Sequence, residues 1–198
     1  MKKTPFPKLK LTVNKVEGEC YHGYKKGDEI VLVDFTHPPK YFCLGLAHAL
    51  FPVIYALSFN AKFPFRENQR SLSVTCPDGG KLEFLTEIYT KEGVLEHIPK
   101  DPDYKGPRPQ RMQIEVIKTK DKCAYHYEAG NTWEVDGLKG IQGFCGAAWH
   151  TLFPALFALN FGAKFTFMRD PDSLNTVTCP DGGNIVFQVK RIAAVNKE

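Results

Sequence analysis

The sequence lacks the features that would place it in a membrane or secreted class. No apolar run reaches the ~20 residues that a membrane-spanning helix needs. The longest mostly apolar stretch, residues 43–59, is shorter and contains His48 and Pro52. Lysines and prolines interrupt the amino terminus, where a signal peptide needs an apolar core of ~7–15 residues. We therefore expect a cytoplasmic protein with no membrane segment.

An excess of charge of one sign is also missing. Of the 198 residues, 26 are lysine or arginine and 22 are aspartate or glutamate, and the two signs are interleaved along the chain. Without a run of like charge, nothing favours nucleic-acid binding over other roles. The content of 43% hydrophobic residues is enough for one substantial core or two small ones.

The feature that dominates the chain is an internal repeat. Its two copies are offset by 103 residues at both ends and by 102 residues in the middle, around a shared histidine, His48 and His150. The predicted units are residues 9–90 and 112–192, and a proline-rich linker, residues 91–111, joins them. The six cysteines are therefore three positions used twice. The aligned pairs are Cys20 with Cys123, Cys43 with Cys145, and Cys76 with Cys179.

Each unit is expected to have an α+β fold. Residues 10–16 and 29–33 read as paired strands, and residues 43–59 carry apolar residues at the three- and four-residue spacing of a helix buried on one face. Pro52 and Pro154 lie inside the predicted helices and favour a kink. Residues 72–76 and 81–88 flank a Pro-Asp-Gly-Gly turn and predict a hairpin. One kinked helix would then pack on an antiparallel sheet in each copy.

The repeated cysteines support three readings. In a reducing compartment they are thiols or metal ligands and not disulfides. They fall at the ends of predicted elements, where three thiolates can form part of a zinc site or hold an iron–sulfur cluster. The chain has no Cys-x-x-Cys pair, which makes the metal motif a weak one. The second interpretation is that these cysteines have only a structural role, as small buried hydrophobic residues. The candidate metal ligands are Cys20, Cys43, Cys76, Cys123, Cys145 and Cys179.

The third reading is a reactive thiol at a helix amino terminus, Cys43 or Cys145, where the helix dipole favours the thiolate. The candidate acid–base partners are His48 and His150. Five residues separate Cys43 from His48, a turn of about 500° around a helix, which leaves the two side chains roughly 140° apart. The histidine is therefore not expected to be a simple fourth ligand, and it can equally satisfy a backbone group near the proline.

The retained pattern resembles an uncharacterised family of small tandem-repeat cysteine proteins associated with anaerobic bacteria and archaea. The resemblance covers both units. It has no established activity to carry over, but its association with anaerobes implies oxygen-sensitive thiol or iron–sulfur chemistry. This chain departs from the pattern at Asn131, where the second copy lacks the aspartate. In the first copy the motif residues are Cys20, Gly27-Asp28, Phe42-Cys43, Phe51-Pro52 and Cys76-Pro77-Asp78.

The sequence therefore predicts a tandem-repeat protein that binds zinc, another transition metal or an iron–sulfur cluster, with a redox or ligand-binding role. Its partner would be a small molecule or a redox protein. The alternatives are a small enzyme that uses a helix N-terminal cysteine with a histidine, and a non-catalytic interaction module with structural cysteines. The sequence leaves open whether there are two sites or one shared site, and whether the chain forms a homo-oligomer.

Overall fold

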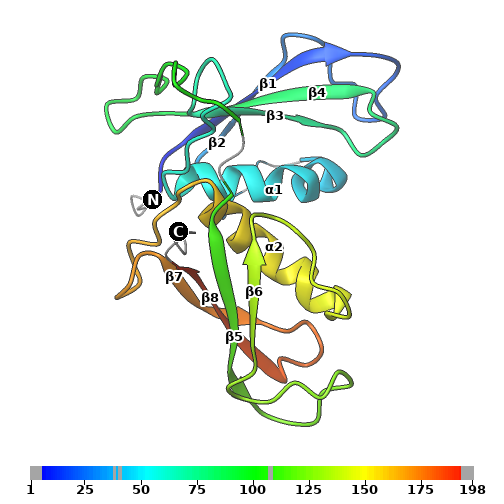
Figure 1. Ribbon diagram of the computed structural model, residues 1–198. Helices are drawn as coiled ribbons and strands as arrows, with labels where there is room; N and C mark the ends of the chain where they lie inside the picture. Colours follow the sequence, from blue (N-terminus) through cyan, green and yellow to red (C-terminus); the bar gives the residue numbers. More distant parts are fainter. Residues whose placement is uncertain (1–5, 38, 40–41, 107–108, 193–198) are drawn as a thin grey trace. The chain divides into compact units, whose positions relative to one another are not determined.

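The computed structural model describes residues 6–37, 39, 42–106 and 109–192 and shows two similar α+β units (Figure 1). The first unit comprises the described residues up to 106 except 59–61, and the second comprises residues 59–61 and 109–192. The predicted fold class is thereby confirmed. The first unit contains β1 (Leu9–Val16), β2 (Glu29–Leu32), α1 (Leu44–Ser58), β3 (Ser71–Thr75) and β4 (Leu82–Ile88). The second contains β5 (Arg111–Thr119), β6 (Thr132–Asp136), α2 (Gly146–Asn160), β7 (Ser173–Thr178) and β8 (Ile185–Ile192).

Both sheets are antiparallel and have the same strand order, β2-β1-β4-β3 and β6-β5-β8-β7 (Figure 1). Alternate residues of the central strands are buried, for example Leu82, Phe84 and Ile88 of β4. The buried stripe of α1, which includes Leu46 and Leu50, supplies the other half of the first core. Each helix contains its proline. Neither helix of the described residues is long and apolar enough to cross a membrane.

An irregularity near the end of the first strand recurs in both copies. The register of β1 against β4 shifts between Val13 and Lys15, and that of β5 against β8 shifts between Val116 and Lys118, at the repeat offset of 103. A bulge bends its strand and raises its local twist. Because it occurs at equivalent positions, it belongs to the fold that both units share.

The turn before the second strand explains the departure at Asn131. The Asp28 carboxylate accepts the backbone N–H of Lys25 at 2.8 Å. The Asn131 side-chain oxygen accepts the N–H of Glu128 at 2.9 Å in the same way. The turn needs an oxygen acceptor and not a charge, so asparagine replaces aspartate without loss of this hydrogen bond.

Most of the proline-rich segment is part of the first unit. Tyr89 forms an isolated antiparallel bridge with Leu95, and Asn68 forms another with Pro99. The backbone N–H of Gln69 donates to the backbone oxygen of Ile98 at 2.8 Å. The extended connector predicted over residues 91–111 therefore has contacts along much of its length, and residues up to 106 belong to the first unit.

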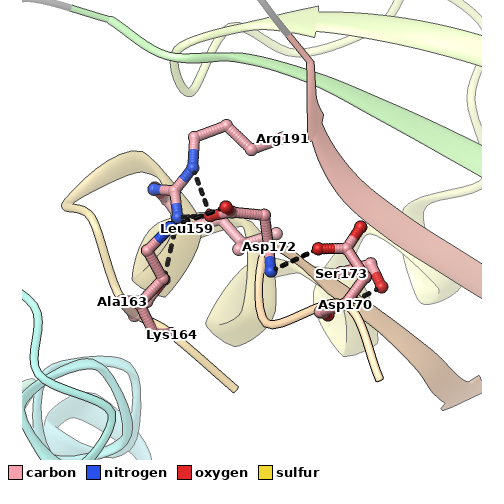
Figure 2. Close-up of polar contacts among 7 residues, drawn as sticks. All are labelled: Leu159, Ala163, Lys164, Asp170, Asp172, Ser173 and Arg191. Atoms are coloured by element: carbon pink, nitrogen blue, oxygen red, sulfur yellow. Dashed lines mark hydrogen bonds and ion pairs between the residues drawn. The ribbon is translucent and has the colours of Figure 1, made fainter. Parts of the chain in front are cut away.

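A mostly buried arginine holds the carboxyl end of α2 in the second unit (Figure 2). Arg191 of β8 donates to the backbone oxygen of Leu159 at 2.6 Å and to that of Ala163 at 3.0 Å. Its Nε donates to the Asp172 carboxylate at 2.9 Å, and Lys164 pairs with the same carboxylate at 2.6 Å. The last carbonyls of a helix have no partners within the helix, so this arginine caps α2.

The first unit also caps its helix with an arginine paired to a carboxylate, but the two charged residues come from other positions of the repeat. Arg70, whose side chain is 3% exposed, donates to the backbone oxygen of Leu57 at 3.3 Å and pairs with Glu96 at 2.9 Å. Leu57 aligns with Leu159, but Arg70 aligns with Asp172 and not with Arg191. The two units therefore hold the same point of the helix with arginines from different places, Arg70 in the turn before β3 and Arg191 in β8.

Replacement of Thr86 by valine is expected to stabilise the protein. Thr86 is completely buried in β4, and its hydroxyl has no hydrogen-bond partner among the described residues. The aligned residue of the second unit is the buried Val189. Removal of an unpaired buried hydroxyl should raise the free energy of unfolding by about 1 kcal/mol, measured by denaturant or thermal unfolding.

The matched control is Val189→Thr, which introduces an unpaired hydroxyl at the equivalent site and should destabilise the protein by about 1–2 kcal/mol. If Thr86→Val lowered the stability instead, the hydroxyl would have to be paired in solution, and the assignment of an orphaned group would be wrong.

Candidate functional site

The three cysteines of each unit follow or precede an ordered element. In the first unit Cys20 lies in the turn after β1, Cys43 directly precedes α1, and Cys76 directly follows β3. All six cysteines of the chain lie within the described residues and are free thiols. Cys179 is buried and the other five are partly exposed. The equivalent residues of the second unit are Cys123, Cys145 and Cys179.

Cys43 and Cys145 begin the two helices. The backbone oxygen of Cys145 accepts the N–H of Trp149 at 2.8 Å, and that of Cys43 accepts the N–H of Ala47 at 2.8 Å. Cys145 is the N-cap residue of α2, and its side chain makes no capping hydrogen bond. The first amides of a helix point outward and carry partial positive charge. Both cysteines therefore lie at the amino-terminal end of a helix.

A tyrosine in each unit joins this helix terminus, and sequence reasoning missed its role. The Tyr127 hydroxyl oxygen accepts the backbone N–H of Cys145 at 2.9 Å. In the first unit the Cys43 amide likewise acts on the Tyr24 hydroxyl and lowers its pKa. A signal was present in the sequence, because Tyr24 and Tyr127 align at the 103-residue offset that relates Cys20 to Cys123.

Aromatic packing fixes both tyrosine rings. Tyr24 packs edge-on against the buried Phe84, with ring centroids 5.7 Å apart and an interplanar angle of 86°. Tyr127 meets the equivalent Phe187 at 6.4 Å and 79°. It is further enclosed by Trp133, at 4.8 Å, and is only 8% exposed. Edge-to-face contacts of this kind have a preferred geometry, so each hydroxyl is held at the start of its helix.

Burial and neighbouring groups shift the pKa of each tyrosine. Burial raises the pKa of Tyr24, the hydrogen bond from the Cys43 amide lowers it, and the charges of Cys43 and Cys20 raise it again. The net pKa lies above its usual value. The pKa of Tyr127 is also above its usual value. Burial raises it, the hydrogen bond from the Cys145 amide lowers it, and Cys145 and Cys123 raise it again. Each phenol is therefore protonated at neutral pH.

The third cysteine lies on the turn next to this pair. In the second unit the Asp181 backbone N–H donates to the Cys179 sulfur at 3.4 Å. In the first unit a Cβ added to Gly45 would lie 3.5 Å from Pro77 Cγ and 4.0 Å from the Cys43 sulfur. The Cys76-Pro77 turn thus approaches the start of α1. The second unit accommodates Ala147 at the position of Gly45.

The structure does not assemble these groups into a complete metal centre. Within the described part of the chain, no three histidine, cysteine, aspartate or glutamate side chains are arranged to hold a metal ion together. His48 and His150 lie at exposed positions of α1 and α2. What the two units share is a helix-start cysteine whose amide acts on a tyrosine hydroxyl, with the other two cysteines directly after strands of the same unit or in the turn that follows. Such a site can bind a soft metal ion, exchange a proton or react with an electrophile.

Comparison of the chain with protein-family models, with curated proteins and with solved structures finds no match. The resemblance to the cysteine-repeat family of anaerobes therefore stays a prediction. Any functional conclusion depends on the geometry of the two thiol sites alone.

Proposed function

We propose that each unit binds a transition-metal ion or an iron–sulfur cluster through its cysteines, and that the protein serves a redox or ligand-binding role in the cytoplasm. The observation that carries this proposal is the recurrence of one arrangement in both units. In each copy the amide of the helix-start cysteine acts on a tyrosine hydroxyl, and that cysteine and the one after the first strand both raise the pKa of this tyrosine. The two copies differ at many surrounding positions but keep all three groups.

Three features of the chemistry favour a metal. Thiolate is a soft ligand that suits zinc, copper(I) and iron–sulfur clusters. Hydrogen bonds to sulfur stabilise metal-bound thiolates and tune their potentials. The Cys179 sulfur already accepts such a bond from the Asp181 amide. Two thiolates leave coordination positions for the turn cysteine and for an external ligand, and an open position is what a ligand-binding or catalytic centre requires.

Metal analysis of the anaerobically purified full chain, with its ultraviolet–visible spectrum, tests the proposal. We expect about two equivalents of zinc, or iron with sulfide and visible absorption, on the basis of one thiol site per unit. Protein that remains free of metal after reconstitution with zinc or with iron and sulfide would contradict the proposal.

A second candidate function is supported by the position of Cys43 and Cys145 at the helix starts. In this alternative the thiolate is a nucleophile or an acid–base group, with His48 or His150 as its partner. Metal-free protein in which one or two thiols are alkylated fast at neutral pH would favour it. If no metal binds and all six thiols stay silent until denaturation, the cysteines only pack, and both candidates fail.

A further inference from the structure

We propose that His37 of the first unit is a nucleophile whose Nε2 accepts a phosphoryl group from an activated donor of the acyl-phosphate class. Asp34 and Thr36 are the residues that position it. The site uses none of the six cysteines, so it goes beyond the proposed metal binding and stands independently of it. It consists of polar side chains in the segment that follows β2.

The oxygens around the His37 ring fix which of its nitrogens carries the proton. The Asp34 carboxylate accepts the Thr36 hydroxyl and the Thr36 backbone N–H, each at 2.7 Å. Since the hydroxyl proton is used in that bond, the Thr36 oxygen is an acceptor toward His37 Nδ1, 2.8 Å away. Both carboxylate oxygens lie near the same nitrogen, at 2.9 and 3.0 Å, and also accept. Nδ1 therefore carries the proton, and Nε2 keeps its lone pair in the neutral ring.

The buried position of Asp34 indicates a role beyond the turn. Its side chain is 0% exposed, whereas that of His37 is 66% exposed. An ionised carboxylate is costly to bury unless a donor or a cation lies near it. A turn needs an oxygen acceptor and no charge, as Asn131 shows in the second unit. The buried charge therefore acts on the imidazole, and the opposite edge of the ring, with Nε2, is the part that a ligand can reach.

The second unit has a different pair at the corresponding place. At the offset of 102 residues that relates the helices, Asp136 and Lys139 correspond to Asp34 and His37. Their side chains are 53% and 79% exposed, and the two charged groups are 3.0 Å apart. A lysine ammonium only donates hydrogen bonds, whereas a neutral imidazole also has a lone pair. The second pair is therefore a surface ion pair, and the proposed acceptor belongs to the first unit.

The transfer step needs only the donor as a co-reactant. The Nε2 lone pair attacks the phosphorus of an acyl phosphate, a P–N bond forms, the P–O bond to the acyl group breaks, and the carboxylate leaves. The imidazole becomes cationic, and its Nδ1 proton stays hydrogen-bonded to Asp34. A carboxylate beside a developing positive charge stabilises that charge. A metal ion would need further ligands, and no group of three metal-binding side chains in the described part of the chain supplies them.

The test treats the full chain with acetyl phosphate at mildly alkaline pH. Mass spectrometry then locates the phosphoryl group under conditions that spare the acid-labile P–N bond. All six histidines lie at exposed positions, so the other five are internal references. We expect His37 to react about tenfold faster than any of them, the effect of one charge-assisted hydrogen bond, and phosphorus NMR to show the Nε2 isomer. Labelling of His37 no faster than that of His97 or His126 would overturn the proposal.

Replacement of Asp34 by asparagine separates a phosphoryl acceptor from a structural turn. Asparagine keeps an oxygen for the Thr36 N–H but removes the charge, so phosphorylation of His37 should fall about tenfold and the Nδ1 isomer should appear. The matched control is Asp136→Asn, which should leave the rate unchanged. If Asp34 only holds the turn, Asp34→Asn will lower the melting temperature without changing rate or isomer, and the proposed role is then wrong. If that variant does not fold, the labelling pattern of the parent chain decides the question by itself.

Discussion

Replacement of both Cys43 and Cys145 by serine is expected to abolish metal binding by the full chain. These thiols begin the two helices, and each lies beside the tyrosine hydroxyl that its own amide contacts. Serine is a much poorer ligand for a soft metal ion than thiolate. Loss of an outer-shell partner alone typically weakens a metal site by roughly 10–100-fold, so loss of a ligand should exceed that range. Metal content after gel filtration against a chelator measures the effect.

The single variants show how many centres the chain carries. Cys43→Ser alone should remove about half of the metal if each unit has its own centre. Loss of all the metal from the single variant would mean one centre per chain. The matched control is the pair His48→Gln and His150→Gln, which changes side chains at exposed helix positions and should leave the metal content unchanged. Full metal content in the double serine variant would rule out Cys43 and Cys145 as ligands.

Replacement of Arg191 by methionine is expected to give the largest loss of stability. Arg191 contacts the backbone oxygens of Leu159 and Ala163 and the Asp172 carboxylate (Figure 2). Methionine restores the apolar volume of the side-chain stem but removes the arginine donor from the Ala163 oxygen, from the Leu159 oxygen, which keeps the Gly162 N–H, and from the Asp172 carboxylate, which keeps Lys164. Removal of one partner from a buried ion pair costs about 3–5 kcal/mol. Since Asp172 is one-third exposed, we expect a loss below that range, about 2–3 kcal/mol, in denaturant unfolding.

The acid dependence of unfolding gives a second measure of the same variant. Burial raises the pKa of Asp172, but hydrogen bonds and charge from Lys164 and Arg191 outweigh it and hold the pKa below its usual value. A carboxylate with a depressed folded-state pKa contributes stability that is fully present above its unfolded value of about 3.9 and is lost as the pH falls through the folded value. Arg191→Met should therefore flatten the loss of stability in acid.

The control for this effect is Lys139→Met, which breaks a surface pair with Asp136 whose lysine side chain is 79% exposed. Exposed pairs of this kind contribute about 0–1 kcal/mol, so the variant should unfold almost as the parent does. Equal losses from Lys139→Met and Arg191→Met would show that Arg191 acts only as a surface charge and that the helix cap is unimportant.

The repeat made the fold class predictable. Apolar spacing in residues 43–59 indicates the helix, the Pro-Asp-Gly-Gly turn indicates the β3–β4 hairpin, and the second copy repeats both. Even the one-residue insertion in the second copy has a structural counterpart. The register of β7 against β8 shifts between Leu174 and Val177, where the offset changes from 102 to 103. An extra residue is absorbed as a bulge and the rest of the strand stays in place.

Contacts between residues far apart in the chain were harder to predict from the sequence. The caps of the two helices escape a comparison of the repeats, because Arg70 and Asp172 occupy the same aligned position with opposite charge. The packing of residues 91–106 on the first unit depends on bridges such as that between Asn68 and Pro99. Proline-rich composition alone favours an extended connector, since composition carries no information about which distant backbone group lies opposite.

The candidate site was also predictable from the sequence only in part. Sequence spacing locates Cys43 and Cys145 at the helix starts and the remaining cysteines at turns. It does not show that Cys20 and Cys43 act on the same hydroxyl, because that proximity depends on how the turn after β1 folds toward α1. The tyrosines align between the copies but resemble ordinary sheet residues until their hydrogen bonds to the cysteine amides are seen.

Because Arg70 and Asp172 occupy the same aligned position with opposite charge, the stretches around them are not interchangeable between the two units. If a crossover copied the stretch around Arg70 over its counterpart in the second unit, an arginine would replace Asp172 beside Arg191, and two guanidinium groups would compete for one helix end. The reverse crossover would set an aspartate near Glu96, against the negative end of α1. Each product would leave charge uncompensated in a partly buried site. Each exchange should therefore weaken the cap of its helix.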